Sequence, residues 1–398
     1  MWRDGHAALT LAPPPRPRLK TVFNDLDQTL AGQRTVVVGS GIVGTTHALF
    51  ALVRGAQVVH LERDPVPRGA TVRNFGLIWV SGRAAGGELA LALRARELWE
   101  EIAATIPGVG FRANGSLTVL CSDAEREVAR RALERPDAAD RGFELLSRDE
   151  ARQRNPALQG DFEAALWCGR DAAVESRLAL GAMRGWMTAT GRYQYLPGRE
   201  LVGLTESGVL DHRGERHAGD QVWLCVGASL SGFAAELFEK EPLRRVRLMM
   251  AETEPLGRAL TTSVANGDSF RYYPAFREDA SSLLDEQESY ARRFAIQLLC
   301  QQRLHGGLTI GDTHEVDEAG LFETRDRPMD LIVAAARSVI GHDLPPIERR
   351  WSGVYHQVEG SGAERYYRRE VADHVVAITG AGGRGMTAAP AIAEESFL

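Results

Sequence analysis

A glycine-rich turn near the start of the chain has the residue types and spacing of a site that binds a nucleotide pyrophosphate. In GSGIVG (39–44), Gly39, Gly41 and Gly44 follow the pattern G-x-G-x-x-G. The first glycine permits a tight turn, the second lets the backbone approach a phosphate, and the third lets a helix pack on the preceding strand. The amide groups at the start of that helix then face the anion. The residues expected to contact a dinucleotide here are Gly39, Ser40, Gly41, Ile42, Val43 and Gly44.

An acidic residue follows this turn at the distance that a dinucleotide site requires. Glu62 comes directly after the next apolar run, 58–61, and Arg63 follows it. A carboxylate in this position binds the 2′-hydroxyl of the adenosine ribose and repels a 2′-phosphate. We therefore expect Glu62 and Arg63 to lie beside the adenosine of the cofactor. The alternative is a strand-to-helix turn with a structural role only.

A second glycine-rich turn lies near the C-terminus, in AITGAGGRGMTAA (377–389). An apolar strand runs into Gly380, so that backbone amides beyond it are available to ribityl or pyrophosphate oxygens or to the pyrimidine edge of a flavin. A nicotinamide cofactor has no evident need for a second such turn, which therefore favours FAD over NAD. The alternative is a plain turn between a strand and a helix. The residues expected to contact the cofactor here are Gly382, Gly383, Arg384, Gly385, Met386 and Thr387.

Two further segments are candidates for the wall of the cofactor site. RGATVRNFGLIWVSG (68–82) is rich in glycine, arginine and aromatic residues, as loops over phosphates and ring systems are, but an ordinary connecting loop is the alternative. VWLCVGASLSGF (222–233) is interpreted as a strand that ends close to the cofactor. The residues expected at the cofactor from these segments and from the chain near 202 are Thr71, Asn74, Phe75, Gly76, Val202 and Gly227.

The elements that must position these turns begin with a βαβ unit at 35–63. A β-branched run at 35–38 suits a strand buried on both faces, and a helical stretch and a second apolar run follow it. Strands are expected at 35–38, 58–61, 115–121, 221–228, 307–312 and 374–381. Helices are expected at 45–54, 86–105, 122–134, 176–190, 229–239 and 326–340. We expect the strands before the two glycine-rich turns to share one sheet.

The composition excludes several classes of protein. The chain has 398 residues, of which 44% are hydrophobic and 25% charged, and its formal net charge is −6. This length suffices for two domains, and the charge gives no basic surface for nucleic acid. No apolar run approaches the ~20 residues of a membrane span. The four scattered cysteines include no CxxC pair, so we expect no metal, no disulfide framework and a cytoplasmic location.

Taken together, GSGIVG with Glu62 and Arg63, the strand end at 225–229, and GAGGRGMT resemble the FAD-dependent amine oxidoreductases of the D-amino-acid oxidase type, which include glycine and sarcosine oxidases. The resemblance extends from residue 35 to the C-terminus. It implies an α/β and α+β fold, in which a Rossmann-like FAD-binding domain carries an inserted antiparallel-sheet substrate domain. The implied parts are a proline-rich N-terminal arm at 1–33, an FAD-binding domain at 34–84, 164–235 and 345–398, and a substrate domain at 85–163 and 236–344.

A narrower resemblance concerns RNFGLIW (73–79), LTIGDTHE (308–315) and TGAGGRGMT (379–387). These stretches look like a bacterial branch of the family whose genes accompany phosphonate degradation, which implies oxidation of an aminophosphonate such as a 2-aminoethylphosphonate derivative.

One departure from the glycine and sarcosine oxidases agrees with that substrate. Those relatives commonly follow a Trp-x-Gly element with an arginine that grips the substrate carboxylate, whereas WSGV (351–354) is followed by Tyr355. Loss of a bidentate arginine contact disfavours an α-amino carboxylate, unless another of the many arginines replaces it.

The resemblance also implies the chemistry. A hydride leaves the carbon that bears a neutral amine and passes to flavin N5, which yields an imine or an aldehyde. FAD is expected to be non-covalent, because sarcosine oxidases carry a late cysteine for that bond and the last cysteine here is Cys300. His314 and Tyr355 are the candidates for positioning the substrate. The candidates for binding it are Arg271, Tyr272, Tyr273, His356 and Arg384.

Alternatives stay open for the residues and for the function. The tyrosines have a plainer role as core, His314 as a structural histidine, and Arg271 as a solvated side chain. The enzyme alternatives are a glycine, sarcosine or D-amino-acid oxidase or dehydrogenase, and a nicotinamide-dependent dehydrogenase. A flavin-bound protein without turnover is the non-enzymatic alternative. The expected partners are a small amine and an electron acceptor, which is oxygen or another acceptor.

Overall fold

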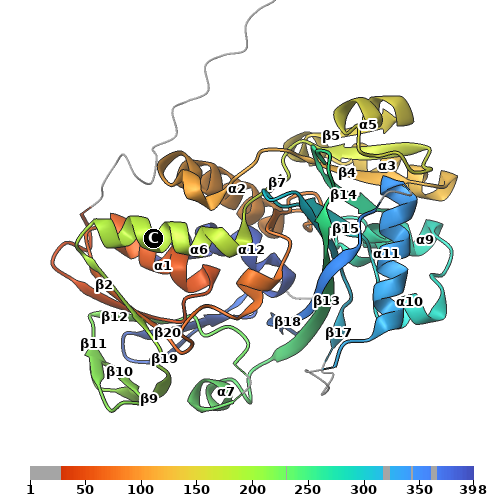
Figure 1. Cartoon of the computed structure of the whole chain (residues 1–398). Coiled ribbons are helices and arrows are strands. Elements are labelled where there is room, and N and C mark those ends of the chain that lie inside the picture. The colour runs from red at the N-terminus through yellow and green to blue at the C-terminus, as the bar shows by residue number, and fades with distance from the viewer. Residues whose placement is uncertain (1–27, 230, 317–322, 342–343, 360–364) are drawn as a thin grey trace, which may run out of the picture.

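A six-stranded sheet carries both glycine-rich turns. The computed structural model of the chain describes residues 28–229, 231–316, 323–341, 344–359 and 365–398 (Figure 1). The strand order is β19–β20–β12–β1–β2–β8, and all neighbours are parallel except β19 and β20. The strands are β1 (Arg34–Val38), β2 (Gln57–Glu62), β8 (Tyr193–Pro197), β12 (Gln221–Leu224), β19 (Tyr367–Ala372) and β20 (Val375–Thr379). Because β12 lies between β1 and β20, the two turns meet at one edge of the sheet.

A group of helices packs on one face of this sheet. These are α1 (Ile42–Val53), α2 (Gly87–Thr105), α6 (Ser176–Ala189) and α12 (Gly385–Ser396), and Figure 1 shows them together above the strands. The side chains of β1 alternate between two cores: Val37 packs with the helices, whereas Val36 and Val38 pack with a small sheet on the other face. That small sheet consists of β9 (Leu201–Thr205), β10 (Gly208–Asp211) and β11 (Arg216–Ala218). The expectation that β1 is buried on both faces is confirmed.

A larger sheet of nine strands lies beside the first. Its order is β17–β13–β16–β15–β14–β4–β6–β5, with β18 paired to β13, and all neighbours are antiparallel except β14 and β4. The strands are β4 (Ser116–Leu120), β5 (Phe143–Ser147), β6 (Ala164–Cys168), β13 (Leu243–Pro255), β14 (Ser263–Asn266), β15 (Leu299–Gln302), β16 (Gly307–Gly311), β17 (Glu315–Val316) and β18 (Ile347–Val358).

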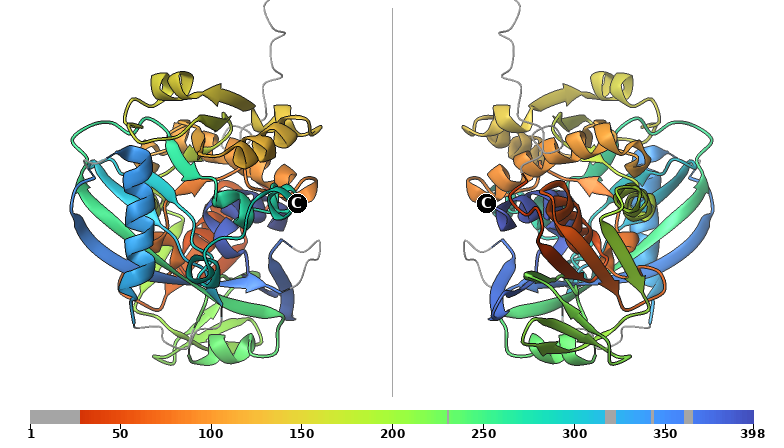
Figure 2. Two further views of the ribbon diagram at one scale, coloured as in Figure 1. Left: turned by 90° about the vertical axis from the view of Figure 1, so that its right-hand side faces the viewer. Right: turned by 90° about the vertical axis from the view of Figure 1, so that its left-hand side faces the viewer.

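Helices cover this larger sheet as well. In Figure 1, α11 (Asp326–Ile340) crosses its face on the side away from the six-stranded sheet. The left view of Figure 2 looks onto α11, and the right view looks onto the red strands of the N-terminal βαβ unit. The remaining helices are short: α3 (Asp123–Leu133), α4 (Ala138–Arg141), α5 (Arg148–Arg154), α7 (Phe233–Leu237), α8 (Ser269–Tyr272), α9 (Arg277–Leu283) and α10 (Ser289–Arg293). A two-stranded sheet, β3 (Leu77–Ile78) with β7 (Ala172–Ala173), completes the fold.

The expected elements are confirmed with small shifts at their ends. Each expected strand and helix has a counterpart; β12 ends earlier than expected, and α7 is shorter than the helix expected at 229–239. Most of the expected N-terminal arm, 1–27, lies outside the described residues. Among the helices of the described residues, none combines the length and apolar character that crossing a membrane requires.

Two strands pair differently from the expected division of the chain. Segments 164–235 and 345–398 were expected in the FAD-binding domain, but β6 and β18, at the starts of these segments, pair in the nine-stranded sheet. The reason is long-range pairing, since β6 pairs with β4 and β5 while β18 runs along the whole length of β13. We propose that the domains follow the two sheets, with boundaries shifted past these strands.

Candidate functional site

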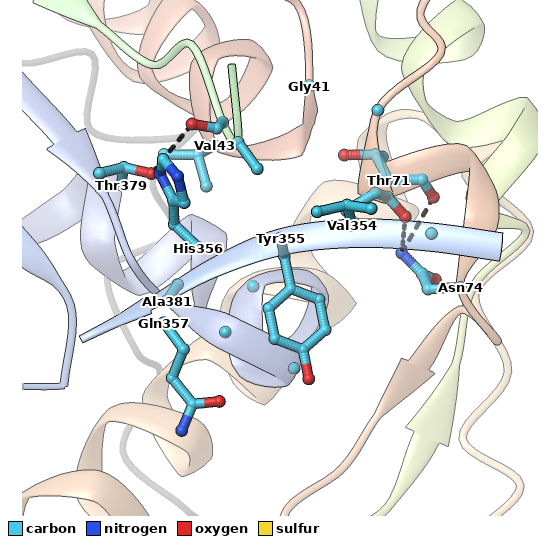
Figure 3. A pocket seen from close by; sticks show the side chains of 18 of the residues that line it. Gly41, Val43, Thr71, Asn74, Val354, Tyr355, His356, Gln357, Thr379 and Ala381 are labelled. Atoms are coloured by element: carbon cyan, nitrogen blue, oxygen red, sulfur yellow. Dashed lines mark hydrogen bonds between the residues drawn. The ribbon is translucent and has the colours of Figure 1, made fainter. Parts of the chain in front are cut away.

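A cavity of about 780 Å³ is lined by residues that both large sheets contribute. Gly39 and Glu62 reach it from the ends of β1 and β2, and Met250 and Tyr355 reach it from β13 and β18. Figure 3 shows part of this cavity, with Tyr355 projecting from β18 and with Gly41 and Thr71 on neighbouring segments. The expected cofactor residues and substrate residues therefore meet in one space.

The first glycine-rich turn is built by backbone contacts that exclude side chains. Gly39 has a φ of +98°, and a Cβ there would lie 2.3 Å from the carbonyl oxygen of Cys225. A Cβ on Gly44 would lie 1.9 Å from the carbonyl oxygen of Gly39. At Gly41 the nearest atom to such a Cβ is Thr71 Oγ1 at 3.3 Å. Gly39 and Gly44 thus shape the turn, and Gly41 leaves room beside it.

The expected contacts of this turn differ in where they lie. Those that line the cavity are Gly39, Gly41, Ile42 and Val43. Ser40 and Gly44 are not among the lining residues. Ser40 instead donates from its backbone N–H and from its hydroxyl to Glu62 Oε2, both at 2.8 Å. Glu62 thus holds the turn in place while it also lines the cavity next to Arg63.

The second glycine-rich turn lies across the cavity from the tyrosines. Gly382 has a φ of +59°, and the lining includes Gly382, Gly383, Arg384, Gly385 and Met386. Thr387 is not in the lining. Its hydroxyl accepts from the backbone N–H of Trp79 at 2.9 Å and donates to the Leu77 carbonyl at 3.3 Å. Thr387 therefore ties the turn to the segment at 68–82.

The space beside Gly383 shows how close the second glycine-rich turn lies to the tyrosine hydroxyls. A Cβ on Gly383 would come no closer than 3.5 Å to the Tyr355 hydroxyl and 3.9 Å to the Tyr272 hydroxyl. Neither α1 nor α12 has a side-chain cap at its N-terminus. The first amide of α1, at Ile42, donates to Thr71 Oγ1, and the first amide of α12, at Gly385, donates to the Gly382 carbonyl. Both helix N-termini line the cavity, and their dipoles favour an anionic ligand there.

The segment at 68–82 covers one side of the cavity. Thr71, Asn74 and Phe75 line it. Thr71 Oγ1 accepts from the Ile42 N–H at 2.9 Å, and the Asn74 amide donates to the carbonyls of Ala70 and Thr71, as Figure 3 shows in part. Thr71 is thereby fixed against the first glycine-rich turn, and Asn74 is fixed against its own segment.

Of three further expected cofactor residues, Gly227 lines the cavity, whereas Gly76 and Val202 do not. Gly76 lies outside the lining, and a Cβ there would lie 2.1 Å from the Val174 carbonyl oxygen. Val202 is 42% exposed and also lies outside it, whereas its neighbour Leu201 lines the cavity. Side chains alternate along a strand, so Leu201 and Val202 of β9 point to opposite faces. Gly227, with a φ of +63°, lies in the lining.

Four of the expected substrate residues surround one end of the cavity. Tyr272, Tyr273, His314 and Tyr355 all line it. The rings of Tyr272 and His314 stack, with centroids 3.9 Å apart and planes 26° apart. Burial lowers the pKa of His314 to about 4, so its imidazole is neutral at pH 7. The buried Tyr355 hydroxyl lies near the Tyr272 hydroxyl but makes no hydrogen bond of ordinary geometry among the described residues, and burial raises its pKa well above the usual value.

The remaining expected substrate residues lie in different surroundings. His356 lines the cavity next to Tyr355, and burial lowers its pKa to about 4. Arg384 lines the cavity with its Nε 3.7 Å from Glu88 Oε1. Arg271 lies outside the lining, where it pairs with Asp268 at 3.3 Å. The single turn of α8 places Tyr272 toward the cavity and Arg271 away from it.

Among the lining residues that the sequence analysis missed, two carry ionisable groups whose pKa values burial shifts. Asp312 comes two positions before His314, and burial raises its pKa to about 8. Arg83 is 5% exposed, and burial lowers its pKa. The signal for Asp312 was its place in the quoted stretch LTIGDTHE, whereas nothing in the sequence separates Arg83 from the other arginines. Pro274 and Arg277 are exposed members of the lining, so the cavity meets solvent there.

These features fit a long dinucleotide that ends in a flavin. Glu62 and Arg63 lie at one end of the lining, the two glycine turns follow, and the aromatic group around Tyr355 lies beyond the second turn. At Gly383 the second turn lies beside the hydroxyls of Tyr272 and Tyr355, so a ligand that reaches this turn also reaches the tyrosines.

Comparisons with known proteins agree with this geometry. The family model described as FAD dependent oxidoreductase (DAO) matches residues 34–396. A subunit of the opine oxidase of Rhizobium meliloti is 26% identical over 172 residues, which cover 39% of this chain and 45% of that protein. The corresponding opine oxidase subunit of Agrobacterium tumefaciens is 22% identical over 332 residues, or 80% of each chain. Glycine oxidase of Bacillus cereus has a similar structure, with a TM-score of 0.71, 16% identity, and coverage of 91% of this chain and 93% of that one.

Proposed function

Because the chain belongs to the family of FAD-dependent oxidoreductases and its cofactor is therefore FAD, we propose that it oxidises a small primary or secondary amine, and that its preferred substrate is an aminophosphonate. The observation that carries this proposal is the meeting of the two glycine turns with Tyr272, His314 and Tyr355 in one cavity. The expected Rossmann-like architecture with a second, mainly antiparallel sheet is present.

The residues of the chain have separate roles in the proposed reaction. When bound, FAD supplies the acceptor for a hydride from the carbon that bears the amine. Glu62 and Arg63 hold the adenosine end, and the glycine turns contact the pyrophosphate, the ribityl chain and the flavin edge. The buried Tyr273 and Tyr355 and the partly buried Tyr272 form a wall that orients the substrate and limits access of water. The neutral His314 supports that wall by stacking on Tyr272.

The choice of an aminophosphonate rests on the side chains near the amine site. Tyr355 stands where glycine and sarcosine oxidases commonly carry a carboxylate-binding arginine. A tetrahedral phosphonate takes hydrogen bonds from several separate donors, and the hydroxyls of Tyr272 and Tyr355 and the guanidinium of Arg384 are available for this. His356 and Arg384 complete the proposed substrate contacts, and Arg271 is no longer among them because it pairs with Asp268 outside the cavity.

A second candidate is oxidation of an amino acid or an opine. The buried Arg83 in the cavity lining favours it, because a guanidinium from another segment is able to replace the missing arginine of β18. Two relatives in sequence are opine oxidase subunits, which makes opines a class to test.

The test is an anaerobic visible spectrum of the purified protein during addition of amines. The panel consists of 2-aminoethylphosphonate, its N-methyl and 1-hydroxy derivatives, glycine, sarcosine, D-alanine and iminodiacetate. Reduction of the flavin removes its absorption band near ~450 nm. Bleaching by a phosphonate alone supports the first candidate, and bleaching by a carboxylate alone supports the second. If no amine bleaches the band, the proposed function is wrong.

A further inference from the structure

A pair of arginines forms one charged end of the part of the cavity that surrounds Tyr272. The Arg83 Nε donates to the Trp79 carbonyl at 2.8 Å, and its two terminal nitrogens have no hydrogen-bond acceptor among the described residues. Glu88 Oε1 lies 3.8 Å from Arg83 Nη1 and 3.7 Å from Arg384 Nε, and it makes no hydrogen bond in the described part of the chain. One carboxylate thus serves two guanidinium groups, which leaves this end with a net positive charge.

A single carboxyl group forms the opposite end. Asp312 is 4% exposed, lines the cavity, and accepts from the Gln297 amide at 3.2 Å through Oδ1. Its Oδ2 lies 3.7 Å from His314 Nε2. Because the buried imidazole is neutral at pH 7, His314 gives Asp312 no counter-charge. Asp312 is therefore a buried acid without a cationic partner among the residues that contact it.

Tyr272 lies between the two ends. Its ring stacks on His314, which neighbours Asp312, and its hydroxyl faces Gly383, which precedes Arg384. The carboxyl of Asp312 and the guanidinium groups of Arg83 and Arg384 all act electrostatically on this hydroxyl, with opposite signs. The part of the cavity that surrounds Tyr272 therefore has guanidinium groups toward one end and a carboxyl group toward the other.

We propose that this charge separation selects a zwitterion, with the anionic group of the substrate bound by Arg83 and Arg384 and its ammonium group bound at Asp312. This proposal rests on the proposed amine oxidation and names its specificity residues. The anionic group is a phosphonate or a carboxylate, since a guanidinium pair binds either. A substrate that lacks the anionic group leaves the buried guanidinium of Arg83 without an anion, which is the strongest basis for rejecting it.

The acidic end also accounts for the proton that the amine has to lose. An ammonium ion beside a carboxylate carries the same number of protons as a neutral amine beside a carboxyl group. Because the pKa of Asp312 is about 8, the free protein carries a carboxyl group there at pH 7, so binding of an ammonium substrate releases one proton to solvent and leaves the neutral amine that hydride removal requires. The carboxyl group that keeps its proton is in contact with Gln297 and close to His314, neither of which competes for it as an anion.

The experiment separates the two ends by using ligands that carry one charge. Ethylphosphonate and propionate carry only an anionic group, and their dissociation constants are measured from the change that they cause in the flavin spectrum of the oxidised holoenzyme. The variants are Arg83→Gln, Arg83→Lys and Asp312→Asn. The matched controls are Arg271→Gln and Asp268→Asn, which remove the same groups from an ion pair outside the cavity.

We expect Arg83→Gln to weaken binding of the better anion by about tenfold or more, and Arg83→Lys to recover part of it. Asp312→Asn is expected to leave anion binding unchanged or improved, but to slow flavin reduction by the corresponding amine at least tenfold. Equal losses in Arg83→Gln and Arg271→Gln would overturn the proposal, as would anion binding that falls in Asp312→Asn. If Arg83→Gln fails to fold, Arg384→Gln takes its place, with FAD content as the check.

Failure of the proposed function is distinguishable from failure of this inference. Anion binding by the oxidised protein does not depend on turnover, so the Arg83 comparison has a result even when no amine reduces the flavin. Ethylphosphonate and propionate that bind equally to all variants refute the two-ended cavity, whatever the substrate panel shows.

Discussion

The ring of Tyr272, at the end of the short helix α8, stacks on the imidazole of His314, which follows strand β16 in the sequence, with ring centroids 3.9 Å apart. The Tyr272 hydroxyl, at the edge of the ring, lies near Gly383 of the second glycine turn. The stack therefore links a segment of the substrate sheet to the wall of the cavity. It also explains how a neutral histidine contributes to a site in which it has no proton to exchange at pH 7.

Replacing His314 tests this supporting role. We expect His314→Phe to keep the stack, the FAD content and most of the thermal stability. His314→Ala removes a ring contact worth about 1 kcal/mol and leaves a gap, so its unfolding midpoint is expected to fall. Thermal unfolding of the holoenzyme distinguishes the two variants. A phenylalanine variant as unstable as the alanine variant would show that the imidazole nitrogens, rather than the stack, carry the effect.

Two glycines of the cofactor turns are expected to respond differently to the same change. Gly44→Ala places a methyl 1.9 Å from the Gly39 carbonyl oxygen, so the turn has to deform and both stability and FAD binding should be lost. Gly383→Ala meets only ordinary contacts, 3.5 Å or longer, inside a short helical turn. Its free energy of unfolding without FAD should therefore be unchanged, or raised by roughly 0.4–1 kcal/mol. FAD binding should still weaken, which fluorescence titration of the FAD-free protein measures.

Glu62→Gln is expected to weaken FAD binding by about tenfold, because an amide is a poorer acceptor for the ribose hydroxyl and for the two Ser40 bonds. The measurement is the dissociation constant of FAD, determined for each variant at the same salt concentration. Glu254→Gln, at an exposed position outside the cavity, is the control. Unchanged FAD affinity in Glu62→Gln would remove this residue from the ribose site.

Tyr355→Phe removes one hydroxyl that makes no hydrogen bond of ordinary geometry among the described residues. Stability and FAD content should be unchanged or slightly improved, because a buried unsatisfied group is deleted. Substrate affinity should fall by about fivefold, which corresponds to one lost hydrogen bond of about 1 kcal/mol. Stopped-flow reduction of the flavin across a range of amine concentrations separates affinity from rate. Equal affinity in both proteins would place the substrate elsewhere in the cavity.

Acid should destabilise the protein through its buried histidines. Burial lowers the pKa values of His47, His60 and His314 from 6.5 to about 4. The unfolded chain thus binds protons first, so the stabilisation present above pH 6.5 is lost as the pH falls toward 4. Each histidine contributes up to about 3 kcal/mol to this loss. Unfolding midpoints from pH 7.5 to 4 measure it. His47→Gln should flatten the profile, whereas the exposed His374→Gln should not.

The sequence predicted the elements and the glycine turns because both depend on short-range patterns. The run at 35–38, the glycine spacing and Glu62 lie within one βαβ unit, and each residue there has a local physical role. Arg83 and Asp312 were missed because a place in the cavity lining depends on long-range packing of the loop before α2 and of the end of β16, which no local pattern encodes. The many arginines also masked Arg83, and Arg271 was placed in the site although a single turn of helix directs it away.

The placement of Val202 shows the same limit at the scale of one residue. The segment near 202 does reach the cavity, but through Leu201. A shift of one position along a strand exchanges its two faces, and the sequence near 202 contains no signal that fixes the register. Nearness of a segment was therefore predictable where the identity of the contacting side chain was not.

A backbone hydrogen bond crosses the boundary between the two sheets. The Val358 N–H, at the end of β18, donates to the carbonyl of Gly380 at 3.1 Å, and an isolated bridge joins Gln357 to Ala381. The strand that carries Tyr355 thus connects the substrate sheet to the second glycine turn by backbone hydrogen bonds. A hinge motion between the two sheets at this point would have to break these backbone hydrogen bonds. We therefore expect substrate to enter and product to leave where the cavity meets solvent, past Pro274 and Arg277.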